Sequence, residues 1–250
     1  MNENTKKLIL LSVVLLGFFS IFFFAPYPQR LEYHNFADKR PLFGIQNSFD
    51  VLSNLPFSIF GILGLVFWAK YPTEVARKSW FVAFLGVFLV GIGSAYYHYN
   101  PNNQTLIWDR LPLTIGFMGV LSALLSMCIS QAWEKYLLPG LVALGAISVF
   151  YWAAYDDLRL YFYVQAIPLV VIPFVVFLFD SSKVEKAPLA YGLLFYLLAK
   201  ITEFSDIKIF EFTHQMISGH TIKHLLASLT VVALAVLVKK TSLKSNNSIV

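Results

Sequence analysis

The chain has 250 residues, of which 58% are hydrophobic and 13% are charged. Average soluble domains carry about 25% charged residues, so this composition, with a mean hydropathy of +0.66, indicates an integral membrane protein. The net charge of +5 comes from lysines and arginines in short connecting segments, where they set topology. We therefore expect no nucleic-acid partner. The one cysteine, Cys128, excludes an intrachain disulfide.

Eight apolar runs are long enough to cross a bilayer as helices, since a spanning helix needs about 20 residues. The first run resembles a secretory signal peptide in its basic start at Lys6 and Lys7. Its apolar stretch of about 17 residues exceeds the usual 7–15, and no A-x-A site follows, so we interpret it as a retained helix. The predicted helices cover residues 8–25, 51–69, 79–99, 110–132, 136–154, 161–180, 187–204 and 217–238.

These runs predict an all-α polytopic membrane helix bundle without a separate soluble domain. We divide the chain into an N-terminal transmembrane helix (1–26), an outer polar loop (27–50), a seven-helix core (51–240) and a cytoplasmic tail (241–250). With the N-terminus in the cytoplasm, the inner side receives eleven lysines and arginines and the outer side seven. This asymmetry follows the positive-inside rule. The short lysine-bearing loops predict a bacterial inner-membrane protein.

Ligand-type side chains gather at the outer ends of three predicted helices. His98 ends the third helix, Asp109 begins the fourth, and His220 and His224 begin the eighth. Because these helices bring their side chains to one depth on one side, they predict a site facing the periplasm. The inner halves of the helices are nearly free of charge, which argues against a metal transporter.

The spacing of these residues suits zinc chemistry. His220 and His224 are four residues apart and share a helix face, so both can bind one zinc ion. His98 would complete a three-histidine set and leave a fourth position for water, whose pKa zinc lowers to about 7. Asp109 would take a proton as general base or orient a histidine, and Ser94, on the same face as His98, would hydrogen-bond an oxyanion.

Each residue also has a simpler interpretation. The histidine pair could sit at the level of the lipid headgroups, Ser94 could serve helix packing, and Asp109 could complement a helix dipole. We expect Lys223, which lies between the paired histidines, to snorkel or to turn away from the metal on the opposite side of the helix.

Taken together, the residues resemble a known family. Ser94-x3-His98, ten intervening residues, Asp109 and the late His220-x3-His224 resemble the alkaline ceramidase family. The early stretch "NSFDVLSNLPF" also resembles the family's first-helix signature. The wider superfamily of membrane hydrolases includes the progestin/adiponectin-receptor-like proteins. The resemblance extends from about residue 33 to 238.

The resemblance implies a seven-helix bundle that holds Zn²⁺ on His98, His220 and His224, with Asp109 and Ser94 beside the reacting water. It implies hydrolysis of the amide bond of a ceramide-like lipid in the bilayer, releasing a fatty acid and a long-chain amine. The chain departs from the family pattern by one additional hydrophobic segment at its N-terminus.

A second departure concerns calcium. Animal members carry an acidic Ca²⁺-binding stretch before the first core helix, where the carboxylates of this chain are Glu32, Asp38 and Asp50, with Asp38 and Asp50 as the candidate cation ligands. Lys39 and Arg40 would oppose a cation there. The alternative is an ordered polar loop packed near the active site.

Two other functions compete with a lipid amidase. One keeps the metal and the fold but cleaves an ester or phosphoester lipid, because activated water attacks either bond. The other is a lipid-sensing receptor with a structural zinc site. The segment 201–215, near the predicted mouth of the site, is either a lid that admits lipid or a simple connection.

Overall fold

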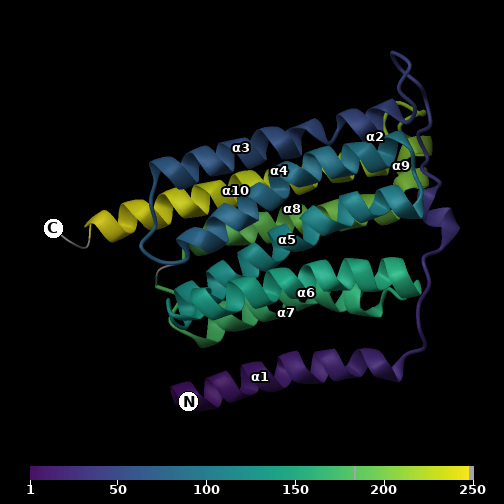
Figure 1. Ribbon diagram of the computed structural model, residues 1–250. Helices are drawn as coiled ribbons and strands as arrows, with labels where there is room; N and C mark the ends of the chain where they lie inside the picture. The colour runs from purple at the N-terminus through teal and green to yellow at the C-terminus, as the bar shows by residue number, and fades with distance from the viewer. Residues whose placement is uncertain (183, 248–250) are drawn as a thin grey trace.

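The computed structural model describes residues 1–182 and 184–247, and its long helices lie side by side in one bundle (Figure 1). Within the described residues the regular structure is helical, apart from an isolated bridge between Leu42 and Ile45 and two short 3₁₀ turns. The α-helices are α1 (Glu3–Ser20), α2 (Ser48–Leu52), α3 (Leu55–Lys70), α4 (Arg77–Tyr99), α5 (Asn103–Cys128), α6 (Trp133–Tyr155), α7 (Arg159–Leu178), α8 (Lys186–Phe204), α9 (Asp206–Phe212) and α10 (Gly219–Asn247).

The predicted all-α membrane bundle is confirmed. Eight helical stretches of the described chain are long and apolar enough to cross a membrane, with α2 and α3 forming one of them. They lie where the sequence predicted helices. The chain is therefore an integral, multi-pass membrane protein.

Helix α5 begins seven residues earlier than the predicted start at 110. The side chain of Asn102 accepts hydrogen bonds from the backbone N–H groups of Gln104 and Thr105, and the backbone N–H of Asn102 donates one to the hydroxyl of Thr105. This capping box satisfies the first free N–H groups of the helix and fixes its start. Asp109 therefore lies in the second turn of α5, and the expectation that it begins the helix was wrong.

The last part of the chain is more helical than predicted. The segment 201–215 contains the end of α8 and the short helix α9, which lies at the same end of the bundle as α2 (Figure 1). Helix α10 continues beyond the predicted end at 238 as far as Asn247. The final three residues of the predicted tail, 248–250, lie outside the described residues.

Helices α4 and α5 pack closely because small residues face each other. A Cβ atom on Gly93 would lie 1.9 Å from the carbonyl oxygen of Trp108, and one on Gly119 would lie 2.7 Å from the backbone nitrogen of Ala83. Small residues let helix backbones approach each other in a membrane. The contact at Gly93 places the end of α4 directly beside Asp109.

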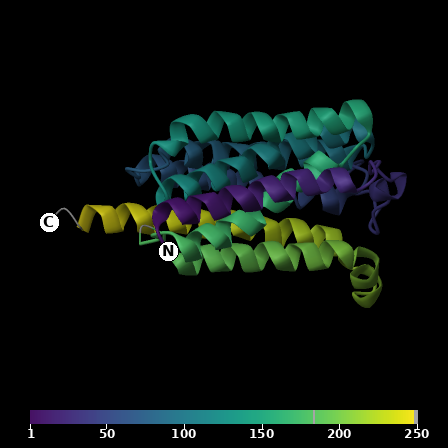
Figure 2. The same ribbon diagram turned by 90° about the horizontal axis from the view of Figure 1, so that it is seen from below.

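Helix α1 lies at one side of the bundle, along α7. The hydroxyl of Tyr163 donates a hydrogen bond of 3.1 Å to the carbonyl of Val14, and the rings of Phe18 and Tyr163 pack edge to face. Figure 2 shows α1 along the outside of the bundle, and Figure 1 shows the chain leaving it to cross one end of the molecule to α2. We call that end, which carries α2 and α9, the histidine end.

A candidate metal centre and active site

The three predicted ligand histidines meet at the histidine end of the bundle. His98 lies in the last turn of α4, and His220 and His224 lie in the first turns of α10. One nitrogen from each ring lies within 4.8 Å of the others, and all three side chains are buried. The Nε2 atoms of His98 and His220 are 3.3 Å apart. This group is able to hold a metal ion.

The start of α10 is held by capping groups that fix the position of both its histidines. The hydroxyl of Ser218 accepts a hydrogen bond of 3.0 Å from the backbone N–H of Thr221. A carboxylate oxygen of Asp206, from α9, accepts one of 2.8 Å from the backbone N–H of His220. Negative charge is favourable at a helix N-terminus. Both contacts satisfy N–H groups that a helix leaves free in its first turn.

Ser53 fixes the ring of His224. Pro56 has no N–H to bond the carbonyl of Leu52, so the first core span breaks between α2 and α3, and Ser53 lies at the break. The Ser53 hydroxyl donates to the carbonyl of Asp50 at 3.0 Å and lies 2.7 Å from Nδ1 of His224. A hydroxyl has one proton, so Nδ1–H of His224 donates to Ser53. The Nε2 atom of His224 then keeps its lone pair for a metal.

His98 is oriented in a different way. Its backbone carbonyl accepts a hydrogen bond of 2.9 Å from the side-chain amide of Asn47. Its ring Nδ1 is buried and has no hydrogen-bond partner among the described residues. Packing of neighbouring aromatic rings therefore holds the imidazole of His98.

Ser94 and Asp109 form the second half of the site. Ser94 lies one turn before His98 on α4, and its side chain lies beside the carboxylate of Asp109 on α5. The structure thus brings both predicted catalytic residues to the neighbourhood of the histidines. The roles predicted for them, Asp109 as general base and Ser94 as a donor to the oxyanion, stay predictions.

Lys223 does not turn away from the histidines, and that prediction was wrong. Residues three apart on a helix share a face, and Nζ of Lys223 lies 3.4 Å from Nε2 of His220. Glu203 on α8 holds it there through an ion pair of 2.8 Å and pairs with Lys200 at 2.7 Å. The sequence analysis missed Glu203, although its spacing of three from Lys200 was a local signal for an ion pair.

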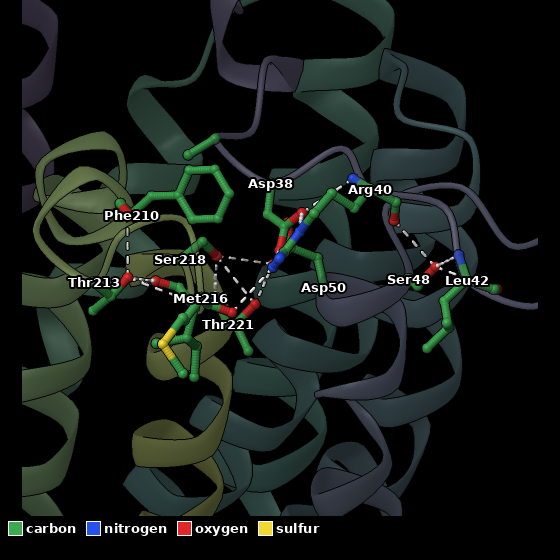
Figure 3. Close-up of polar contacts among 12 residues, drawn as sticks. Asp38, Arg40, Leu42, Ser48, Asp50, Phe210, Thr213, Met216, Ser218 and Thr221 are labelled. Atoms are coloured by element: carbon green, nitrogen blue, oxygen red, sulfur yellow. Dashed lines mark hydrogen bonds and ion pairs between the residues drawn. The ribbon is translucent and has the colours of Figure 1, made fainter.

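The two carboxylates predicted for calcium lie close to this site but have other partners (Figure 3). Both carboxylate oxygens of Asp38 bond the guanidinium of Arg40, at 2.6 and 2.9 Å. Asp50 is fully buried and accepts hydrogen bonds from the hydroxyls of Thr221 and Ser218, at 2.8 and 3.4 Å. Within the described residues, neither belongs to a cluster of three histidine, cysteine or acidic side chains. The calcium site stays a prediction.

The sequence of the region that carries these residues shows to which family the chain belongs. Residues 45–248, which include α2 to α10 and all three histidines, match the family model described as Ceramidase. The chain belongs to the ceramidase family. No curated protein matches it.

Membership of the ceramidase family agrees with the resemblance seen in the sequence. It indicates a membrane hydrolase that acts on a lipid amide of the ceramide type. The match begins just before α2, so residues 1–44, which include α1, lie outside the ceramidase match.

Proposed function

We propose that this ceramidase-family protein is a zinc-dependent hydrolase that cleaves the amide bond of a ceramide-like lipid into a fatty acid and a long-chain amine. The observation that carries the proposal is the buried group of His98, His220 and His224, with Ser94 and Asp109 beside it.

The donor set fits zinc. Three imidazoles are a common ligand set of catalytic zinc, which keeps its fourth position open. The nitrogens lie within 4.8 Å of one another, and Ser53 leaves Nε2 of His224 free to bind. These three histidines would hold the ion. Bound zinc would act as a Lewis acid that acidifies water and polarises a carbonyl.

The residues of the chain account for the movement of the proton. The carboxylate of Asp109 takes a proton from the attacking water, whose oxygen bonds to the carbonyl carbon of the amide. As the C–N bond breaks, Asp109 passes the proton to the leaving nitrogen, which departs as the amine. Ser94, whose side chain lies beside this carboxylate, would keep it oriented through both transfers. The acyl group leaves with the oxygen of the water as a fatty acid.

The charges beside the histidines support this reaction. The ammonium of Lys223 lies within 3.4 Å of a site histidine and is held by Glu203. A fixed positive charge favours a carbonyl oxygen that becomes negative as water attacks. It also favours the carboxylate of the fatty acid product.

The first experiment is to measure the zinc content of the purified protein by elemental analysis. We expect about one zinc per chain, as a three-histidine site binds a single ion. The double variant His220→Ala with His224→Ala should lose it, whereas His214→Ala, at an exposed histidine outside the cluster, should keep it. A metal-free wild type, purified without chelators, would overturn the zinc mechanism.

The second experiment identifies the bond. Fatty acid release from a ceramide should exceed release from an ester with the same acyl chain. Faster cleavage of the ester would assign the site to ester lipids. Zinc binding without any turnover of either lipid would support a lipid-sensing receptor instead.

A further inference from the structure

The segment that joins α1 to α2, residues 24–47, crosses the histidine end of the bundle (Figure 1). Almost all of it lies outside the ceramidase match, which begins at residue 45. It nevertheless contacts the site. We call it the connecting segment.

Its first part is fixed to the loop between α6 and α7. The backbone N–H of Gln29 donates to the side chain of Asp156 at 2.9 Å, and that of Tyr27 donates to Asp157 at 3.3 Å. The carbonyl of Tyr27 accepts from the backbone N–H of Leu158 at 2.9 Å. These bonds attach the segment to the core of the bundle.

Its middle part is fixed to Arg110, one residue after the proposed general base. The guanidinium is buried and lies against the rings of Trp152 and Tyr161, at 4.2 and 4.5 Å from their centres. It donates a hydrogen bond of 2.6 Å to the side chain of Gln29, and the ring of Tyr33 lies 5.6 Å away. Cation–π contacts are stronger when the cation is removed from water, so these contacts hold the guanidinium firmly in place.

Its last part is tied to the start of α10. One carboxylate oxygen of Asp206 accepts from the backbone N–H of Ala37 at 3.0 Å, and the other accepts from the backbone N–H of His220 at 2.8 Å. The side chain of Arg40 donates to the carbonyl of Met216 at 3.0 Å, as Figure 3 shows. The segment and the first turn of α10 thus share one carboxylate.

Phe36 lies between these attachments and packs onto the histidines. Its side chain is only 6% exposed. Its ring centre is 4.6 Å from that of His98 and 4.7 Å from that of His220. It also packs edge to face with Tyr97, whose hydroxyl contacts Nδ1 of His34 at 2.9 Å.

We propose that Phe36 is a positioning residue for the metal centre, supplied by a segment outside the ceramidase core. Metal-binding histidines normally have their second ring nitrogen fixed by a hydrogen bond. His224 has such a partner in Ser53, whereas Nδ1 of His98 has none among the described residues. The ring of Phe36 takes the place of that hydrogen bond, because it restricts the rotation of the His98 ring. The Phe36 ring also keeps water away from that side of the three histidines.

This inference rests on the proposed metal site but makes a separate prediction. Removing a group that orients a ligand typically weakens metal binding about 10- to 100-fold. Phe36→Ala should therefore bind Zn²⁺ at least about tenfold more weakly than the wild type. Phe36→Tyr, which keeps the ring, should bind within a few-fold of the wild type. The matched control is Phe43→Ala, because Phe43 belongs to the same segment but is 88% exposed.

The measurement is the Zn²⁺ affinity of each purified full-length protein, by competition with a chromophoric chelator. If Phe36→Ala does not fold, Phe36→Leu takes its place, because leucine keeps most of the apolar volume. Phe36→Leu should lose Zn²⁺ affinity to a smaller degree than Phe36→Ala. Equal affinity of Phe36→Leu, Phe36→Ala and wild type would overturn the role of Phe36 alone. A wild type that binds no Zn²⁺ would overturn the metal site together with this inference.

Discussion

The hydroxyl of Ser53 lies 2.7 Å from Nδ1 of His224, although the two residues are 171 positions apart in the chain. This contact fixes which nitrogen of His224 faces the other two histidines. The contact joins the break between α2 and α3 to α10, the last helix. Much of the proposed chemistry depends on contacts of this long-range kind.

Ser53→Ala should weaken zinc binding without unfolding the protein. The substitution removes the partner of Nδ1, and loss of such a group typically costs about 10- to 100-fold in metal affinity. Chelator competition on the purified variant measures the effect. Ser53→Thr, which keeps a hydroxyl, should restore affinity. Ser126→Ala is the control, since Ser126 is buried and its hydroxyl has no partner among the described residues. An unchanged affinity in Ser53→Ala would show that packing alone orients His224.

Asp109→Asn should abolish most turnover and leave zinc bound. General acid–base catalysis contributes about 10²- to 10⁴-fold, and an amide cannot take the proton. Ser94→Ala should cost less, about 10- to 100-fold in kcat, because a hydrogen bond to a charged group contributes about 1.5–3 kcal/mol. Fatty acid release and zinc content are measured on the same samples. If Asp109→Asn loses its zinc, the carboxylate serves the metal site rather than the proton transfer.

Glu203→Gln should destabilise the protein because it leaves the ammonium groups of Lys200 and Lys223 without their shared carboxylate. Breaking a buried ion pair costs about 3–5 kcal/mol, and we expect the lower end since Lys223 keeps 20% of its side-chain surface exposed. Thermal unfolding in detergent measures the loss. Adding Lys223→Met should recover part of the stability, as expected for coupled neighbours. If the effects of Glu203→Gln and Lys223→Met on the unfolding temperature simply added, the ion pair between Glu203 and Lys223 would be contradicted.

Gly93→Ala should force α4 away from α5 and disturb the contact between Ser94 and Asp109. The new Cβ atom would lie 1.9 Å from the carbonyl oxygen of Trp108, a backbone atom that cannot rotate away. Overpacking costs about 1–3 kcal/mol, occasionally more. Gly140→Ala is the matched control, because its Cβ position has no neighbour within 4 Å apart from the adjoining backbone of its own helix. It should be neutral or stabilise α6 by up to about 1 kcal/mol. Equal unfolding temperatures for the two variants would contradict the close packing of α4 and α5.

Acid should weaken the attachment of the connecting segment at Asp157. Hydrogen bonds from Arg159 hold the pKa of the Asp157 carboxyl below its ordinary value. A lowered pKa in the folded state contributes stability above the unfolded pKa of about 3.9, and this is lost as the pH falls through the folded pKa. The unfolding temperature of the wild type should therefore exceed that of Asp157→Asn at pH 6, and the difference should shrink below about pH 4. A difference that stays constant with pH would contradict this.

The sequence by itself determined the class of the protein and the identity of the candidate ligands. Long apolar runs must form helices in a bilayer, because the backbone cannot find hydrogen-bond partners in lipid. The spacing of four between Ser94 and His98, and between His220 and His224, places each pair on one helix face. Hydrophobic length and the spacing of residues within one helix are local properties, so they can be read directly from the sequence.

The tertiary structure decided what surrounds those ligands. The pairing of Lys223 with Glu203, the bond between Ser53 and His224, and the packing of Phe36 against two histidines each join elements that are remote in sequence. Local spacing does not encode them, because they depend on how far each helix is shifted and rotated against its neighbours. The close approach at Gly93 and the capping box at Asn102 set that placement for α4 and α5, and thereby bring Asp109 beside Ser94.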